Sequence, residues 1–414
     1  MSTAVTVDIE TLSARLGALC AINPLAPDGA CRLALTDEDR AGRDLFARWA
    51  GESGLAVTID AIGNMFATLP GKDSSLAPVM SGSHLDTVAT GGRFDGALGV
   101  IAALGVLEAV RAAGVTPHRS LVAAAFTNEE GARFAPDMLG SLVFVGGLSV
   151  EDARATRAVD GALLGAELDR IGYAGPRKPG AIAPHAFVEL HVEQGPILDA
   201  EGIAIGVVDG VQGISWREIA LEGEANHAGA TPMAMRHDAG YAAAAIAASL
   251  RRLTQRIPGL LATCGRILLE PNLVNVIPER AVLTVDLRHP EEARLAEADA
   301  ALDAEIATAA AEADVTVSQR TLARFEPVTF ADTIRDKVAA AAAARGLSQR
   351  RLISGAGHDA QMLARVAPAG MIFAPSIGGI SHNPAEASRD ADIAAAVAVL
   401  ADVLTTLCLE EVAP

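Results

Sequence analysis

Five residues of the types that bind metal ions lie in five separate segments of the chain, each just after a short apolar run. They are His84 in SGSHLDTV, Asp95 in GGRFDGALG, Glu130 in TNEEGARF, His191 in ELHVEQG and His382 in GGISHNP. Two divalent ions about 3.5 Å apart need such a set, with imidazoles and carboxylates on each ion and one carboxylate shared between them. The pattern predicts a dinuclear metal centre that catalyses hydrolysis.

Each of these residues also has an ordinary structural explanation, and the local context favours chemistry. A lone histidine is usually a core or surface residue, a glutamate pair usually begins a helix, and FDG is typical of a turn. His84 and Asp86, however, alternate after the apolar run LAPVMSGS, so in a strand both face one side and Asp86 can orient His84. Glu129 and Glu130 follow LVAAAFTN, where parallel sheets place their sites.

Hydrolysis of an amide-type bond is the reaction that suits this set. The metals would lower the pKa of a shared water to near neutral. Glu129 would act as general base towards that water and later deliver the proton to the leaving nitrogen. His227 in ANHAGATPM is a candidate donor to the oxyanion, with a capping or core role as the equal alternative.

A carboxylate or ureido group on the substrate would need its own binding residues. Arg288, at the end of LTVDLRH, can bind a carboxylate through two hydrogen bonds, or can instead pair with Asp286. Asn275 in NLVNVIPE offers an amide next to it, and Gln194 can bond the scissile group. Taken singly, each of these residues is more often structural.

Length and charge limit the classes of protein. A chain of 414 residues is expected to form two domains. The formal charge is 33 − 51 = −18, which argues against nucleic acid or an anionic membrane as partner. A small anionic substrate stays possible, because one arginine and two divalent cations can reverse the field inside a cleft.

The cysteines and the N-terminus favour a soluble cytoplasmic protein. Four cysteines show no metal-ligand spacing and are expected to be reduced thiols. The N-terminal MSTAVTVDIE is acidic where a signal peptide is basic. The best candidate for a membrane span, ALGVIAALGVLEAVRAAGV, is interrupted by Glu108 and Arg111.

The order of the elements predicts one domain interrupted by another. Up to residue 210, helical patterns near 7–21, 37–53, 97–113 and 138–146 alternate with strand patterns at 55–59, 64–69, 78–82, 120–126, 186–191 and 203–208. This alternation is typical of an α/β domain with a mixed, largely parallel sheet. The same alternation of helices and strands returns near residue 330, with helices at 331–345 and 389–406 around the strand AGMIFAPS. His382 is therefore expected to belong to the first domain.

The segment between them has a different order, β-α-β-β-α-β, which predicts a ferredoxin-like sandwich. Its strands are ISWREIALEGEA, ATCGRILLE, AVLTVDLRH and DVTVSQR, and its helices lie near 236–253 and 290–313. We therefore expect a catalytic domain of residues 1–212 plus 330–414 and an inserted lid of residues 213–329. An antiparallel sheet of this size has a free edge and a free face, which dimerisation commonly covers.

Seven motifs between about residue 55 and 390 resemble, in the same order, the hydantoinase/carbamoylase family of dinuclear metal amidohydrolases. They are SGSHLDTVATGGRFDGALGV, TNEEGARF, HVEQGPIL, ANHAGATPM, NVIPERAVLTVDLRH, SGAGHDAQ and GGISHNPAE. The family includes N-carbamoyl-L-amino acid hydrolases, allantoate amidohydrolases and β-ureidopropionases. Related exopeptidases carry a lysine after the bridging aspartate and an acidic ligand at the position of His191, so both differences favour the carbamoylase branch.

The resemblance implies a zinc-exopeptidase-like α/β catalytic domain with a mixed sheet and an inserted ferredoxin-like α+β domain that serves as lid and dimerisation domain. It implies two divalent ions per subunit, zinc by abundance, with manganese, cobalt or nickel as alternatives. One ion would be bound by His84, Asp95 and His191. The other would be bound by the shared Asp95, Glu130 and His382. Glu129 falls on the position of the general base, with Asp86 beside the ligands as a further catalytic residue.

The resemblance also implies substrate-binding residues. His227, Asn275 and Arg288 fall on lid positions that bind the oxyanion and the substrate carboxylate. His227 and Asn275 are expected to reach the active site of the partner subunit, which makes a homodimer through the inserted domain necessary for catalysis. Gln194 and the loop of Gly357 and His358 fall on further substrate-contacting positions.

The expected reaction is hydrolysis of the C–N bond of an N-carbamoyl-L-amino acid, a small anionic ureido compound, to the amino acid, ammonia and carbon dioxide. Allantoate and 3-ureidopropionate are alternative substrates within the family. An aminoacylase or dipeptidase is a further alternative, and a metal-stabilised dimeric binding protein without turnover is a third.

Overall fold

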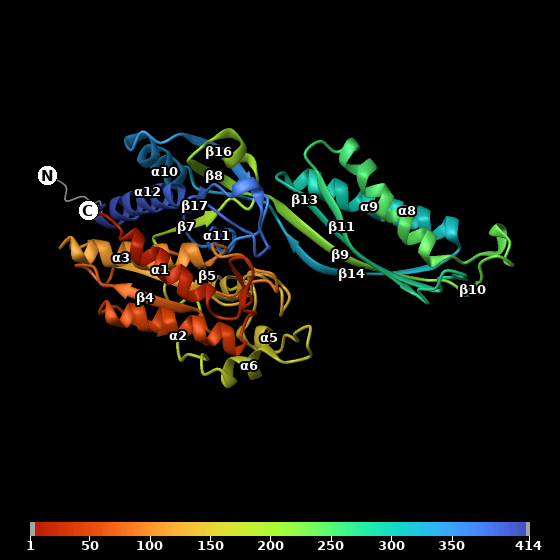
Figure 1. Cartoon of the computed structure of the whole chain (residues 1–414), viewed down its shortest axis with the longest axis horizontal. Coiled ribbons are helices and arrows are strands. Elements are labelled where there is room, and N and C mark those ends of the chain that lie inside the picture. Colours follow the sequence, from red (N-terminus) through yellow and green to blue (C-terminus); the bar gives the residue numbers. More distant parts are fainter. Residues whose placement is uncertain (1–4, 411–414) are drawn as a thin grey trace. The chain divides into compact units, whose positions relative to one another are not determined.

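The computed structural model describes residues 5–410, and the chain divides into two compact units (Figure 1). Unit 1 contains the chain up to Val211 and again from Thr329, and unit 2 is the inserted segment Gln212–Val328. The boundaries expected from the sequence lie one residue further along the chain at both junctions.

A nine-stranded mixed sheet forms the centre of unit 1, in the order β15-β8-β17-β7-β5-β6-β4-β3, with β16 beside β8. The four central strands β17, β7, β5 and β6 are parallel, and every residue in them is buried. Apolar and small residues at each position, as in LVAAAF, are typical of a parallel strand covered on both faces. The strands are β3 (Ala56–Ile59), β4 (Met65–Leu69), β5 (Val79–His84), β6 (Leu121–Phe126), β7 (Ala186–Val192), β8 (Ile205–Val211), β15 (Val328–Thr329), β16 (Gln349–Ser354) and β17 (Ala369–Ala374).

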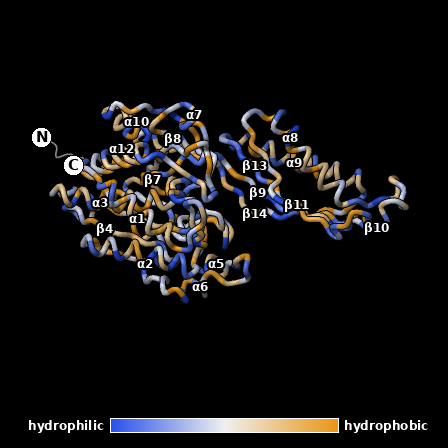
Figure 2. Tube along the Cα trace, viewed as in Figure 1, coloured by the Kyte–Doolittle hydropathy of each residue, from blue (hydrophilic) through white to orange (hydrophobic). Residues whose placement is uncertain are grey.

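Helices pack against this sheet and fix the loops at the ends of its strands. Helix α3 contacts β5, β6 and β7, and its sequence is apolar almost throughout (Figure 2). Helix α12 contacts β7 and β17, while α10 contacts β8 and α12. The long helices are α1 (Ile9–Cys20), α2 (Asp37–Glu52), α3 (Ala97–Ala112), α10 (Asp332–Ala344) and α12 (Asp390–Leu409). Short elements between them are β1 (Pro24–Leu25), β2 (Gly29–Ala30), α4 (Leu139–Phe144), α5 (Val150–Arg154), α6 (Leu164–Arg170), α7 (Ile197–Glu201), α11 (Asp359–Leu363) and the 3-10 turn η2 (Ile377–Gly379).

Among the described residues, α12 is the one helix long and apolar enough by length and composition to cross a membrane, with a mean hydropathy of 2.0. The segment 97–115, which is the best candidate from the sequence alone, is not such a helix, because α3 has only 16 residues whereas α12 has 20. Of the apolar window in α12, 56% is buried inside the protein. The helix packs on α3, α10, β7 and β17, as a core helix of unit 1 does.

Unit 2 is a four-stranded antiparallel sheet with two helices packed on one face. The sheet order is β11-β13-β9-β14, and the chain order is β-α-β-β-α-β, so the ferredoxin-like arrangement predicted from the sequence is present. The elements are β9 (Gly213–Glu222), α8 (Ala239–Arg256), β11 (Leu261–Glu270), β13 (Arg280–His289), α9 (Glu292–Ala313) and β14 (Thr316–Phe325). A smaller pair, β10 (Asn226–His227) and β12 (Val276–Ile277), and the 3-10 turn η1 (Met233–Met235) complete the unit.

The two faces of the unit 2 sheet differ in polarity. In β13 the alternate residues Ala281, Leu283, Val285 and Leu287 are buried in the cluster formed with α8 and α9. The residues between them point to the face without helices. Strand β11 lies at the edge of the sheet and exposes apolar side chains: Leu261 is 55% exposed, Ile267 44% and Leu268 52%. The unit therefore has the free edge and the free face that its sequence predicted.

Candidate metal centre

The predicted ligands meet at the carboxyl ends of the central parallel strands of unit 1, where such sheets carry their sites. His84 is the last residue of β5, and His191 is the last but one of β7. Glu130 follows the end of β6 after a short turn. Asp95 comes from the loop that leads into α3, and His382 from the loop that follows η2.

The carboxylate of Asp95 lies between two groups of candidate ligands. Its Oδ1 is 3.7 Å from Nε2 of His84 and 3.3 Å from Nε2 of His191. Its Oδ2 is 3.4 Å from Nε2 of His382, which is also 3.4 Å from Oε2 of Glu130. An ion bound tetrahedrally at about 2.0–2.2 Å leaves its ligand atoms about 3.3–3.6 Å apart. The spacing therefore fits one divalent ion on each side of Asp95.

The orientation of the two buried histidines also fits metal binding. Nδ1 of His84 is 2.9 Å from the carbonyl oxygen of Asp86, and Nδ1 of His191 is 2.9 Å from that of Val192. A carbonyl oxygen only accepts, so Nδ1 carries the proton in each ring and Nε2 turns towards Asp95. Metal-binding histidines are commonly fixed in this way.

The prediction that the side chain of Asp86 orients His84 is wrong. Strand β5 ends at His84, so the alternation of a strand does not extend to Asp86, and its main-chain carbonyl makes the contact. The carboxylate of Asp86 instead accepts hydrogen bonds from the N–H of Glu129 (3.2 Å) and of Glu130 (3.3 Å). Burial, together with the charge of Asp39, raises the pKa of Asp86 to about 7. Asp86 therefore fixes the turn that presents both glutamates.

Glu129 and Glu130 point in different directions from this turn. Glu130 accepts a hydrogen bond from the N–H of Val88 (3.1 Å) with Oε1, while its Oε2 faces His382. Glu129 is only 7% exposed, and its Oε2 is 3.3 Å from Nε2 of His84. Burial, followed by the charge of Asp359, raises the pKa of Glu129 well above its usual range. A carboxylate with a raised pKa beside a ligand cluster is a candidate general base.

The candidate ligands are coupled to one another by charge. Burial lowers the pKa of His84 to about 4. Burial would also lower the pKa of His191, but its hydrogen bond to Asp95 and the charge of Asp95 raise it to about 9. Burial opposes the change in Asp95, whose pKa is nevertheless lowered by His191. The charge of each of these groups therefore depends on the others, and an ion bound there would change all of them.

Gln194 and His358 contact candidate metal ligands. The amide of Gln194 donates to Oδ2 of Asp95 (3.0 Å) and to the hydroxyl of Ser381 (3.1 Å). His358 is buried, and its ring centre is 4.6 Å from that of His191. Gly357 lies against Met138, whose Cε would be 2.9 Å from a Cβ at this position. The structure thus places Gln194 and His358 beside the ligands, and Gly357 precedes His358 in the chain. The contact of these three residues with substrate stays a prediction.

A second group with metal-ligand spacing, made of Glu189, His191 and His358, does not favour a further ion. Glu189 already accepts from the hydroxyl of Ser83 (2.7 Å) and from the N–H of Ala360 (2.8 Å). Nε2 of His191 faces Asp95, and its Nδ1 is bound to a carbonyl. Nε2 of His358 lies 2.9 Å from the hydroxyl of Ser354. Each residue of this group is therefore engaged by other partners.

In unit 2, His227 has the tautomer that an oxyanion donor needs. The side chain is exposed, and Nδ1 accepts from the N–H of Gly229 (3.0 Å) and of Ala230 (3.1 Å). The proton of the neutral ring therefore sits on Nε2. Asn275 is close by, because its neighbour Val276 pairs with His227 across β10 and β12.

Arg288 lies elsewhere in unit 2. Its guanidinium contacts both carboxylate oxygens of Asp286 at 2.8–3.1 Å, as in the pairing considered from the sequence. The prediction that Asn275 lies next to Arg288 is wrong. Asn275 precedes β12, whereas Arg288 is near the far end of β13 (Arg280–His289), and a strand advances about 3.3 Å per residue.

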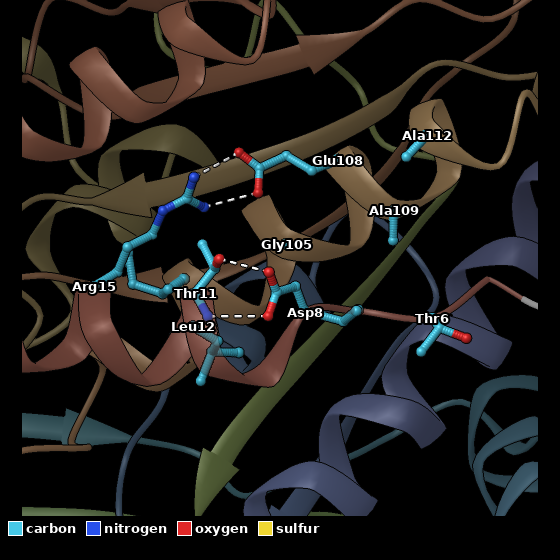
Figure 3. A pocket seen from close by; sticks show the side chains of 11 residues that line it. Thr6, Asp8, Thr11, Leu12, Arg15, Gly105, Glu108, Ala109 and Ala112 are labelled. Atoms are coloured by element: carbon cyan, nitrogen blue, oxygen red, sulfur yellow. Dashed lines mark hydrogen bonds and ion pairs between the residues drawn. The ribbon is translucent and has the colours of Figure 1, made fainter.

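A hollow between α1 and α3, of about 250 Å³, is distinct from the metal centre (Figure 3). Arg15 and Glu108 on its wall are joined by two hydrogen bonds of 2.8 and 2.9 Å, and Asp8 caps α1 through Thr11. None of the candidate ligands lines this hollow. Because its charged groups satisfy one another, it is not favoured as the active centre.

Gly96 is a site residue that was not predicted from the sequence. A Cβ at this position would lie 2.4 Å from Cε1 and 2.5 Å from Nε2 of His84, and its φ is +62°. Only glycine adopts this conformation readily and leaves room for the imidazole. The glycine of the motif FDG could have indicated a close contact with a ligand. It was interpreted only as a turn residue.

Gly96→Ala is expected to lower metal affinity and turnover by about 10–100-fold, because the methyl group displaces His84. Gly114→Ala is the matched control, since Gly114 has a φ of +67° but nothing within 4 Å of its Cβ position. Metal content by mass spectrometry and kcat/KM would be compared for the two variants. Equal metal binding by both would contradict the prediction.

Known proteins of one family are similar to this chain. The model of Peptidase family M20/M25/M40 matches residues 80–406. The chain is 43% identical over 381 residues to N-carbamoyl-L-amino-acid amidohydrolase of Rhizobium meliloti, covering 92% of each chain. It is 36% identical over 357 residues to allantoate amidohydrolase of Bacillus subtilis, covering 86% of this chain and 87% of that one.

A solved structure agrees with the sequence relatives. An amidase of the hydantoinase/carbamoylase family from Burkholderia vietnamiensis matches with a TM-score of 0.94 and 42% identity over 100% of both chains. The α/β fold with a mixed sheet and the family resemblance predicted from the sequence are thereby confirmed. The chain therefore belongs to peptidase family M20/M25/M40, in the hydantoinase/carbamoylase branch of hydrolases that act on carbon–nitrogen bonds other than peptide bonds.

Proposed function

We propose that this hydrolase cleaves the C–N bond of N-carbamoyl-L-amino acids, releasing the amino acid, ammonia and carbon dioxide. The observation that carries the proposal is the carboxylate of Asp95 between two ligand groups, with Glu129 3.3 Å from His84. The relative of 43% identity named for this substrate class supports it. Allantoate is the second candidate, supported by the relative of 36% identity, and 3-ureidopropionate is the third.

Two divalent ions complete the proposed centre. His84, Asp95 and His191 would hold one, and Asp95, Glu130 and His382 would hold the other. Such ions lower the pKa of a bound water to near neutral and polarise the scissile carbonyl. A donor set of nitrogen and oxygen without thiolate suits zinc first, and manganese, cobalt or nickel as alternatives.

The protein groups supply proton transfer and orientation. Glu129 accepts the proton of the attacking water and delivers it to the leaving nitrogen. His227 donates its Nε2–H to the developing oxyanion. Arg288, which pairs with Asp286 here, would exchange that pairing for the substrate carboxylate. Asp86 holds the N–H groups of Glu129 and Glu130, so the base keeps its position while the proton moves.

We further propose that unit 2 acts as lid and dimerisation domain. The exposed apolar residues of edge strand β11 and the sheet face without helices support this, because a second copy of the chain would cover both. In that dimer, His227 and Asn275 of one subunit serve the active site of the other. The four cysteines are free thiols, which supports a reducing compartment and hence the cytoplasm.

The decisive experiment is a substrate panel on protein reconstituted with Zn²⁺ or Mn²⁺. Ammonia release from N-carbamoyl-L-amino acids, allantoate and 3-ureidopropionate would be measured beside hydrolysis of N-acetyl amino acids and dipeptides. We expect the highest kcat/KM for N-carbamoyl-L-amino acids. Preference for allantoate would move the chain to the second candidate, and cleavage of acetyl or peptide bonds alone would overturn the proposal.

A further inference from the structure

A buried glutamate that the mechanism does not use, Glu386, lies beside the loop that carries Asp95. It is 2% exposed and belongs to the same loop as His382. Its Oε1 accepts hydrogen bonds from the N–H of Phe94 (2.9 Å) and of Asp95 (3.1 Å). The main chain of the candidate shared ligand is therefore held by the carboxylate of Glu386.

The other oxygen of Glu386 reaches the side chain of Asp95 through two further groups. Oε2 accepts from the hydroxyl of Ser381 (3.0 Å), so the single proton of that hydroxyl is used there. The oxygen of Ser381 then accepts from the amide of Gln194 (3.1 Å), and the same amide nitrogen donates to Oδ2 of Asp95 (3.0 Å). All the hydrogen bonds in this chain have a fixed direction. Glu386 thus orients both the main chain and the carboxylate of Asp95.

The side chain of Glu386 packs directly against Gly92. A Cβ on Gly92 would lie 2.4 Å from Cδ and from Oε1 of Glu386, so only glycine fits there. The hydroxyl of Thr90 donates to the carbonyl oxygen of His382 (2.9 Å), which joins the same two loops a second time. The loop of Asp95 and the loop of His382 are therefore fastened to each other around Glu386.

A simpler explanation of Glu386 is that it only caps main-chain N–H groups that would otherwise be unpaired. Glu193 is an example of that role. The carboxylate of Glu193 accepts from the N–H of Ile197 (2.9 Å) and of Leu198 (2.8 Å) at the start of α7. No hydrogen bond of this carboxylate reaches a candidate ligand. Glu386 also accepts two main-chain hydrogen bonds, but one of them comes from a candidate ligand. A third hydrogen bond, from Ser381, links Glu386 through Gln194 to the carboxylate of that ligand.

We propose that Glu386 is a positioning residue that sets the Asp95 carboxylate between the two ions and joins it to the loop of His382. The proposal rests on the proposed function in one respect, the sharing of Asp95 by two ions. Glu386 contacts neither ion nor substrate. It acts through Asp95, Ser381 and Gln194.

The test is a metal titration of protein freed of ions by a chelator. In Glu386→Ala, the affinity for Zn²⁺ or Mn²⁺ measured by calorimetry is expected to fall about 10–100-fold, with fewer than two ions retained after dialysis. Glu386→Gln is expected to restore most of that affinity, because its amide oxygen still accepts from Phe94 and Asp95. Glu193→Ala is the matched control: it also loses two main-chain hydrogen bonds, so its melting temperature falls while its metal affinity stays that of the wild type.

The outcomes separate a positioning role from a structural one. If Glu386→Ala lowers the melting temperature but binds both ions as the wild type does, the proposal is overturned. Should that variant fail to fold, Gly92→Ala displaces the same carboxylate and is expected to weaken metal binding, and unchanged binding there also overturns it. Failure of the proposed function would appear in the substrate panel of the wild-type protein. Failure of this inference would appear only in the difference between variants.

Discussion

Glu129→Gln is expected to lower kcat by about 10²–10⁴-fold while both ions stay bound. The amide has nearly the shape of the carboxylate but cannot accept the proton of the attacking water. Glu129 is buried, and its main-chain N–H donates a hydrogen bond to Asp86. The position of its backbone therefore does not depend on its own side chain. The substitution therefore leaves the turn in place. Steady-state kinetics with an N-carbamoyl-L-amino acid and metal analysis of the same sample would check both parts.

The neighbouring residue supplies the contrast for this experiment. Oε2 of Glu130 is 3.4 Å from Nε2 of His382 at the second ligand group. Glu130→Gln is therefore expected to lose metal together with activity, whereas Glu129→Gln loses activity alone. Turnover by Glu129→Gln at the wild-type rate would remove Glu129 from the mechanism. Loss of metal from it would make Glu129 a ligand instead of a base.

The same variant tests the proposed dimer. If each active site uses Glu129 of one subunit and His227 of the other, a mixed dimer of Glu129→Gln and His227→Ala chains contains one complete site. Two inactive proteins are then expected to recover activity when they are dissociated and reassembled together. Absence of recovery in a verified mixed dimer would show that His227 serves its own subunit or neither.

The regular elements could be predicted from the sequence because their burial is continuous or periodic. Strands such as LVAAAF in β6 and helices such as α3 have an apolar composition that suits only the buried interior. Strand β16 (Gln349–Ser354) was missed because QRRLIS is polar and lies beside β8 at one side of the sheet. Its pairing with β8 depends on tertiary contacts that local sequence does not encode.

The candidate ligands could also be found from the sequence, since each stands at a strand end or in a distinctive loop. The residues that position them were harder to find. Glu386 acts on Asp95, which is 291 residues away in the sequence. Gly96 contacts His84 because the loop between them folds back. The error over Asp86 has the same origin, because a strand pattern was extended past the last residue of β5.

Asp95→Asn should have the largest effect on metal binding, because Asp95 is the one residue common to both ligand groups. A neutral amide is a weaker ligand than a carboxylate, and it can offer only one oxygen where Asp95 presents one to each side. Its nitrogen would face either the imidazoles of His84 and His191 or the amide of Gln194, which already donates to Oδ2. Metal analysis after dialysis is expected to show fewer than one ion per chain, and activity should fall at least as far as in Glu129→Gln.

Asp60→Asn is the control for this substitution. Asp60 is also a buried aspartate of unit 1, but its carboxylate accepts from Ile62 and Asn64 rather than facing a histidine. Metal content in that variant should stay at the wild-type level even if the protein becomes less stable. Retention of two ions by Asp95→Asn with wild-type affinity would mean that the ions do not share this carboxylate. Glu386 would then have no shared ligand to position. This result therefore tests both the shared carboxylate of Asp95 and the positioning role of Glu386.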